Sequence, residues 1–97
     1  MIIQWKQHAK EKFAERAIKL GINYGDIEFE IKKQEVKIQQ GKNKYKTIFK
    51  IQKILITVIK IEKNEKIGII TMWDSNKKEE QIWKKQKNAF FAEEKEY

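Results

Sequence analysis

The chain has 97 residues, of which 40% are hydrophobic and 37% are charged, and its formal net charge at pH 7 is +8. This length holds one hydrophobic core, so we expect a single domain over residues 1–97, and the hydrophobic content is too high for a disordered chain. The absence of cysteine excludes disulfides and thiolate metal sites, and one histidine without an acidic cluster argues against other metal sites, so neither a metal nor a cofactor is expected.

The positive charge is concentrated in one segment. Residues 32–60 contain nine lysines and a single acid, Glu35, which is an excess equal to the whole net charge. Such a stretch favours polyanionic partners, of which nucleic acid is the commonest inside a cell. The alternative is that the lysines only solvate the strands of an Ile- and Lys-rich protein.

The N-terminal stretch MIIQWKQHAKEKF becomes charged after five residues and lacks the apolar core of a secretion signal. The longest strongly apolar run, ILITVI at residues 54–59, is far shorter than the roughly 20 residues of a membrane-spanning helix. We therefore expect a cytoplasmic protein that has no membrane partner.

Two helices are predicted at the start of the chain. The first covers residues 4–20 and ends at Gly21, which suits a C-cap. Its apolar residues recur at steps of three and four and share one face: Ala9, Phe13, Ala17 and Leu20. The segment INYGDIEFEIKK (22–33) predicts a short second helix with Asn23 or Asp26 as its N-cap, although DIEFEI also alternates like a strand.

Beyond residue 34 the hydrophobic period changes to two. Four strands are predicted, in EVKIQQ, KYKTIFKIQ, KILITVIKIE and KIGIITMW, and their connections are too short for parallel crossovers. On the second strand, one face should pack into the core, whereas the other, with Lys44, Lys46 and Lys50, should stay hydrated and positive. The third strand is apolar on both faces and should be covered on both sides.

A final helix is predicted over residues 76–94, with Asp74 or Ser75 as its cap. The predicted fold class is therefore α+β, with N-terminal helices packed on a four-stranded antiparallel sheet and a C-terminal helix.

The only histidine lies on the first predicted helix. His8, Lys12 and Arg16 are spaced by four residues and form a stripe beside the apolar face. Cleavage of RNA by its own 2′-hydroxyl needs a base, an acid and cations at the phosphate, which this stripe would supply without a metal. The alternative is a solvated helix flank on which Glu11 and Glu15 pair with the cations.

The segments HAKEKFAERAI, GINYGDIEFEI and KIGIITMW resemble a superfamily of small toxin ribonucleases that includes barnase, colicin D and the RelE/BrnT-like proteins. Their pattern is a helix with His-Ala and a later Arg, then "gi…dv…ai", and a last strand reading "iiTvy" or "iiTvW". The resemblance covers about residues 4–73. It implies a RelE-like fold, metal-independent cleavage of tRNA or mRNA, and an acidic antitoxin as a protein partner.

The resemblance also implies roles for single residues. His8 would be the general acid/base and Arg16 the phosphate ligand, reinforced by Lys12, and Thr71 and Trp73 would line the site. The glycine after the first helix comes later here than in the family pattern, which shifts the register of Arg16. A site with one histidine also needs a second proton-transfer group, which Lys12 or Tyr45 would supply.

Aromatic side chains beside a lysine-rich sheet are suited to stack on RNA bases. Most of them should fill the core of so small a domain. We expect Trp73 to contact RNA, together with Tyr45, Lys44 and Lys46 on the second strand.

Three functions follow from the sequence. The first is the toxin-like ribonuclease, and the second is a non-catalytic RNA- or DNA-binding module of the same fold. The third is a protein-interaction domain, such as an inhibitor or a viral accessory protein, whose basic face binds an acidic partner.

Overall fold

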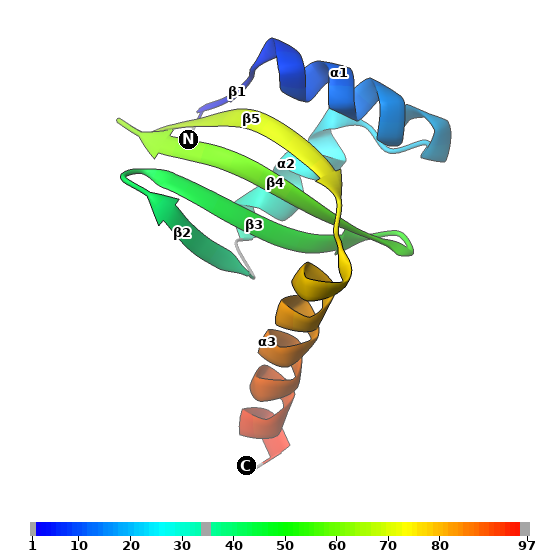
Figure 1. Ribbon diagram of the computed structural model, residues 1–97, viewed down its shortest axis with the longest axis vertical. Coiled ribbons are helices and arrows are strands. Elements are labelled where there is room, and N and C mark those ends of the chain that lie inside the picture. Colours follow the sequence, from blue (N-terminus) through cyan, green and yellow to red (C-terminus); the bar gives the residue numbers. More distant parts are fainter. Residues whose placement is uncertain (1, 34–35, 96–97) are drawn as a thin grey trace.

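The computed structural model describes residues 2–33 and 36–95, with side chains placed up to residue 86. Figure 1 shows a curved sheet with α1 and α2 on one side of it and α3 leading away from it. In chain order the elements are β1 (Ile2–Trp5), α1 (Gln7–Arg16), the 3-10 turn η1 (Ile18–Leu20), α2 (Tyr24–Lys33), β2 (Lys37–Gly41), β3 (Lys44–Ile51), β4 (Ile54–Lys63), β5 (Lys66–Asp74) and α3 (Lys77–Lys95).

The sheet has five strands in the order β1-β5-β4-β3-β2. Strands β2 to β5 form the antiparallel meander that the sequence predicts, whereas β1 pairs with β5 in parallel. The predicted α+β class, with helices on a sheet, is confirmed. The sheet itself is mixed and five-stranded, and the four-stranded antiparallel prediction is corrected in that respect.

Strand β1 takes the place of the expected start of the first helix. Gln4 and Trp5 belong to this strand, in which Ile3 lies beside Ile67 and Trp5 beside Ile69. Ile3 and Trp5 both pack against the core. Because the sequence IIQW does not alternate apolar with polar residues, this segment could be read into the helical pattern that follows.

Helix α1 is shorter than predicted. Ala9 and Phe13 are buried on its inner side, but the helix ends at Arg16 and not at Leu20. The chain continues as η1, which ends at Gly21 in the left-handed conformation, with a φ of 73°. The predicted C-cap residue thus terminates η1 and not α1.

Helix α2 begins with a reciprocal cap. The Asp26 amide donates to Asn23 Oδ1, and the Asn23 amide donates to Asp26 Oδ2, both at 2.9 Å. The cap stabilises the first turn, and Ile27 and Ile31 are buried one turn apart. These observations confirm the second predicted helix over its strand alternative.

The two faces of the sheet differ in what covers them. The inner face packs against α1 and α2, and its core residues include Phe49, Ile56, Val58 and Met72. We call the opposite side the outer face; cross-strand register assigns to it Lys44, Lys46, Ile48, Lys50, Leu55, Thr57, Ile59, Ile61, Lys63, Lys66, Gly68, Thr71 and Trp73. The start of α3 covers the part near Trp73, whereas Ile61 at the other end is 37% exposed.

The outer face of β3 is therefore only partly the hydrated lysine surface that the sequence predicts. Lys44 and Lys50 are exposed, but Ile48 between them is fully buried and Lys46 pairs with Glu79 of α3. The apolar third strand of the prediction, β4, is buried on both sides over most of its length.

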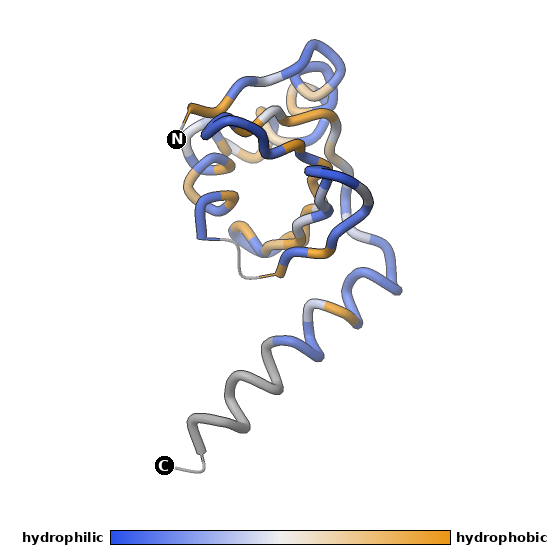
Figure 2. Tube along the Cα trace, turned by 90° about the vertical axis from the view of Figure 1, so that its left-hand side faces the viewer, coloured by the Kyte–Doolittle hydropathy of each residue, from blue (hydrophilic) through white to orange (hydrophobic). Residues whose placement is uncertain are grey.

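Helix α3 extends from the end of β5 and carries mostly hydrophilic residues over its described part (Figure 2). Among the helices that the structure describes, none has the length and apolar content that crossing a membrane would require.

A buried lysine lies on the inner face near the end of β4, beside two further charged side chains. Lys60 is fully buried and its Nζ lies 2.7 Å from Glu62 Oε2, while Lys37 Nζ lies 2.9 Å from Glu62 Oε1. Burial lowers the pKa of Lys60, and the nearby Glu62 offsets part of this effect. Burial alone would raise the pKa of Glu62, but hydrogen bonds and charge interactions with Lys60 and Lys37 bring it below its ordinary value.

Candidate nucleic-acid interface

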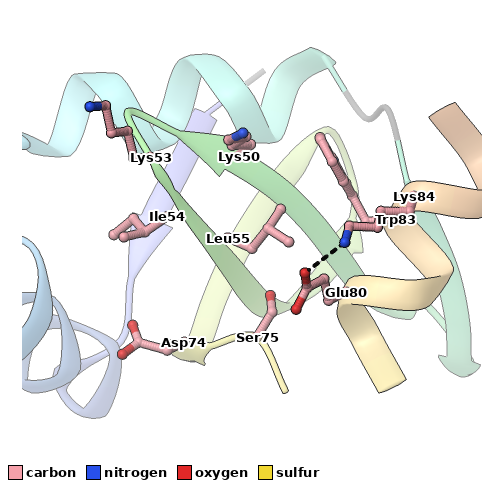
Figure 3. Close-up of a pocket in the computed structure, with 9 residues that line it drawn as sticks. All are labelled: Lys50, Lys53, Ile54, Leu55, Asp74, Ser75, Glu80, Trp83 and Lys84. Atoms are coloured by element: carbon pink, nitrogen blue, oxygen red, sulfur yellow. Dashed lines mark ion pairs between the residues drawn. The ribbon is translucent and has the colours of Figure 1, made fainter. Parts of the chain in front are cut away.

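A pocket of about 350 Å³ lies where α3 approaches the turn between β3 and β4 (Figure 3). Trp83 lines it from α3, and Ile54 and Leu55 line it from the start of β4. Lysines from three segments surround it, and the full set of lining residues is Lys50, Lys53, Ile54, Leu55, Asp74, Ser75, Glu80, Trp83 and Lys84. The pocket thus combines an indole, aliphatic side chains and several cations.

The first turn of α3 fixes the direction in which its side chains point. The Glu79 amide donates to Asn76 Oδ1 at 2.8 Å, and the Asn76 amide donates to Glu79 Oε1 at 2.9 Å. This reciprocal cap starts the helix. Residues three and four positions apart then share one side of the helix, so Glu80, Trp83 and Lys84 all face the pocket.

The cap of α3 is therefore Asn76 and not Asp74 or Ser75 as the sequence predicts. Asp74 is the last residue of β5. Ser75 continues the pairing with β4, because its amide donates to the carbonyl oxygen of Leu55 at 3.0 Å and its hydroxyl lies 2.8 Å from that of Thr57. These bonds hold the junction between β5 and α3 at the floor of the pocket.

Glu79 attaches α3 to the outer face. Its side chain is 3% exposed and accepts a hydrogen bond from Trp73 Nε1 at 2.9 Å, and its second oxygen lies 3.2 Å from Lys46 Nζ. Burial alone would raise the pKa of Glu79, but the Asn76 amide, Trp73 and Lys46 together lower it below its ordinary value. Glu79 is therefore an ionised anchor that ties α3 to β3 and β5.

The carboxylates at the pocket are neutralised by local partners. Glu80 pairs with Lys84 at 3.0 Å, and Asp74 pairs with Arg16 of α1 at 3.1 Å. Lys50 and Lys53 form no ion pair within the described part of the chain, and Lys50 Nζ lies 5.9 Å from the centroid of the Trp83 ring. The balance of charge at the pocket is therefore positive.

The predicted stripe on α1 does not converge on one point. His8 is exposed in the first turn of α1, Lys12 lies 3.7 Å from Glu15, and Arg16 pairs with Asp74. Eight residues of α-helix separate the backbones of His8 and Arg16 by about 12 Å. Arg16 is thus next to the pocket, whereas His8 is at the opposite end of α1.

The other predicted site residues lie on different sides of the sheet. Thr71, Trp73, Lys44 and Lys46 are on the outer face, away from α1. Tyr45 is on the inner face, where its ring centroid lies 4.2 Å from Lys37 Nζ. The structure brings Trp73 and Lys46 together through Glu79, but it does not place either of them with His8.

No family model, curated protein or solved structure matched the chain. The resemblance to toxin ribonucleases therefore stays a prediction, and functional inference depends on the side chains described above. In the part of the chain that is described, no three histidine, aspartate or glutamate side chains gather where they could hold a metal ion.

The sequence predicts Trp73, and not Trp83, as the aromatic residue that contacts RNA, and it does not predict a site formed by Trp83 and the lysines around it. Lys50 and Lys53 flank the tight turn between β3 and β4, and Trp83 and Lys84 follow a helix cap by two turns. The sequence does contain the spacing between the helix cap and Trp83, and this spacing fixes the side of α3 on which the Trp83 side chain lies. Its proximity to the turn depends on how α3 lies on the sheet, which the local pattern does not contain.

Proposed function

We propose that the protein binds single-stranded RNA at the pocket beside α3, with a base stacked on Trp83 and the flanking phosphates held by Lys50 and Lys53. The observation that carries the proposal is the position of the Trp83 indole in a pocket where Lys50 and Lys53 form no ion pair with any described residue, while both carboxylates at the pocket are already paired. Aromatic rings beside cations are the usual means of holding a single strand without reading its sequence.

A single strand suits this pocket better than a duplex. In a duplex the faces of the bases are covered by their neighbours, so a side chain inside a pocket has no ring to stack on. In a single strand, an unstacked base can enter between α3 and the β3–β4 turn while its phosphates remain at the rim. The exposed lysines of residues 32–60 would add long-range attraction for the strand.

The test is fluorescence anisotropy with a labelled uridine decanucleotide, comparing wild type with Trp83→Ala and Trp83→Phe. Stacking of a base on an aromatic side chain contributes about 1–3 kcal/mol, so Trp83→Ala should weaken binding about 5- to 150-fold. Trp83→Phe keeps an aromatic face and should retain most of the affinity. Unchanged thermal unfolding of the variants would show that the pocket, and not the fold, was altered.

Two results would overturn this proposal. Equal affinity of wild type and Trp83→Ala would remove the pocket from RNA binding, and tighter binding of a duplex of the same sequence would remove the preference for a single strand. Binding of an acidic protein but of no RNA would favour the protein-interaction hypothesis instead.

The same mixtures also report on the ribonuclease hypothesis. The decanucleotide is incubated in EDTA with wild type and with His8→Ala, and the products are mapped. We expect intact RNA with both proteins, because the geometry keeps His8 away from the pocket. Discrete cuts by wild type that disappear in His8→Ala would instead establish cleavage and make the protein more than a binding module.

A further inference from the structure

A second pocket, of about 310 Å³, lies at the other end of the sheet, beside the turn between β4 and β5. Lysines surround it on three segments of the chain: Lys6 follows β1, Lys63 ends β4 and Lys66 begins β5. The remaining lining residues are uncharged, so no carboxylate opposes the three lysines within the lining. We call this site the far groove.

The floor of the far groove is partly apolar. Ile61 and Ile70 line it, and Gly68, the cross-strand partner of Ile61, has no side chain. The aliphatic stem of Lys6 lies over Gly68, with its Cε 3.7 Å from where a Cβ would be. The two isoleucines thus remain for contact with an uncharged ring, and the ammonium groups of the three lysines surround them.

Both pockets open on the outer face and are joined by the same two strands. Along β4, alternate residues share a face, so Leu55 of the first pocket and Ile61 and Lys63 of the far groove point the same way. Six residues of strand separate Leu55 from Ile61, which is about 20 Å. The half-buried Thr71 and Trp73 of β5 lie on this face between the two sites.

We propose that the far groove is a second subsite for the RNA strand that binds at Trp83, and that it holds phosphates with Lys63 and Lys66. This inference rests on the proposed function. At the 3.4 Å spacing of a stacked strand, 20 Å corresponds to about six nucleotide steps. A trinucleotide should then occupy one site, whereas a decanucleotide should reach both and bind more tightly.

The experiment measures the affinity of a uridine trinucleotide and a uridine decanucleotide at several salt concentrations. The variant is the double substitution Lys63→Gln and Lys66→Gln. The control is Lys10→Gln with Lys19→Gln, which removes the same charge from exposed positions on α1 and η1. For a single strand, each lost phosphate contact reduces the slope of log K against log salt concentration by about 0.7 in magnitude. With the decanucleotide, the slope of the double variant should therefore be smaller than that of wild type by about 1.4.

The trinucleotide separates the two proposals. If the inference holds, the double variant binds the trinucleotide as tightly as wild type does. In the double variant the decanucleotide no longer binds more tightly than the trinucleotide, whereas in the control variant it still does. A decanucleotide slope that is unchanged in the double variant, or that falls equally in the control, overturns the second subsite alone. Trinucleotide binding that survives Trp83→Ala overturns the proposed function, and the inference with it.

Discussion

Glu79 shows how one side chain can decide the position of a helix. It caps α3 through Asn76 and at the same time receives Trp73 and Lys46 from the sheet. A carboxylate that is almost fully buried would be unfavourable without these partners, because a buried charge costs free energy unless it is paired and hydrogen-bonded. Its contacts are therefore the reason that α3 begins on the outer face.

Replacement of Glu79 by Gln should lower the free energy of unfolding at pH 7 by about 1–3 kcal/mol, since charge-assisted hydrogen bonds are lost. Because folding lowers the pKa of Glu79, its contribution is present above the unfolded value of about 4.3 and is lost as the pH falls through the folded value. The difference between wild type and Glu79→Gln should therefore shrink in acid, as urea unfolding at pH 7 and pH 3 would show.

The matched control is Glu80→Gln, one residue further along α3. Glu80 forms a surface ion pair with Lys84, which should change stability by less than about 0.5 kcal/mol. An equal loss in both variants, or a difference that does not depend on pH, would contradict the role given to Glu79.

The turn between β4 and β5 carries local strain. Asn64 and Glu65 both have positive φ angles, 52° and 62°. Two consecutive central residues with positive φ form a type I′ turn, whose twist matches that of the two flanking strands. Asn followed by Gly is the preferred sequence of this turn. Glu65 occupies the position that favours glycine, and as a residue with a Cβ it is strained there.

Replacement of Glu65 by Gly should therefore stabilise the protein, by about 0.5–1 kcal/mol, because relief of strain exceeds the added flexibility of the unfolded chain. Thermal unfolding of wild type, Glu65→Gly and Glu65→Ala would measure this. The alanine variant removes the charge but keeps the Cβ, so it should gain nothing. A gain in Glu65→Ala equal to that in Glu65→Gly would assign the effect to charge and not to the backbone.

Most elements could be predicted from local pattern. Strands β2 to β5 lie close to the segments with a period of two, because each is bounded by a short polar turn and packs one apolar face. Strand β1 could not be predicted, since its burial depends on Ile67 and Ile69, more than 60 residues later in the chain. The cap of α3 was missed because Asp74, Ser75 and Asn76 are all good capping residues, and pairing with β4 uses the first two.

The candidate site was predicted less well than the fold. The sequence identifies which residues are basic or aromatic, but it does not show that Trp73 hydrogen-bonds to Glu79 or that Arg16 pairs with Asp74. Both contacts join segments that are apart in the sequence. Lys50 and Trp83 meet for the same reason, and tertiary packing alone brings them to one pocket.

At the scale of the whole molecule, a net charge of +8 coexists with a lysine inside the protein. Lys60 is buried beside Glu62, and its pKa is lower in the folded chain than its ordinary value because of burial. Between the folded pKa and about 10.4, the unfolded state binds more protons than the native state, so Lys60 makes stability rise with pH in that window.

We therefore expect the free energy of unfolding of wild type, minus that of Lys60→Met, to increase between pH 7 and pH 10. Urea titrations at both values measure this difference, in which the titration of all other groups largely cancels. Lys63→Gln, at an exposed position on the same strand, is the control for loss of a lysine charge, and the increase for Lys60→Met should exceed any change that it shows. A decrease for Lys60→Met would mean that the native state holds the Lys60 proton more tightly than the unfolded chain does.

The parallel pairing of β1 with β5 has a consequence for the order in which the fold can form. The hairpins of the meander each close a turn of a few residues, whereas Ile3 must pair with Ile67 across about two thirds of the chain. Closing so long a loop has a larger entropic cost and slows folding, so the hairpins can assemble before β1 docks. We therefore expect the first strand in the sequence to be the last to join the sheet, and until it does, the edge of β5 would keep its backbone groups open to another chain.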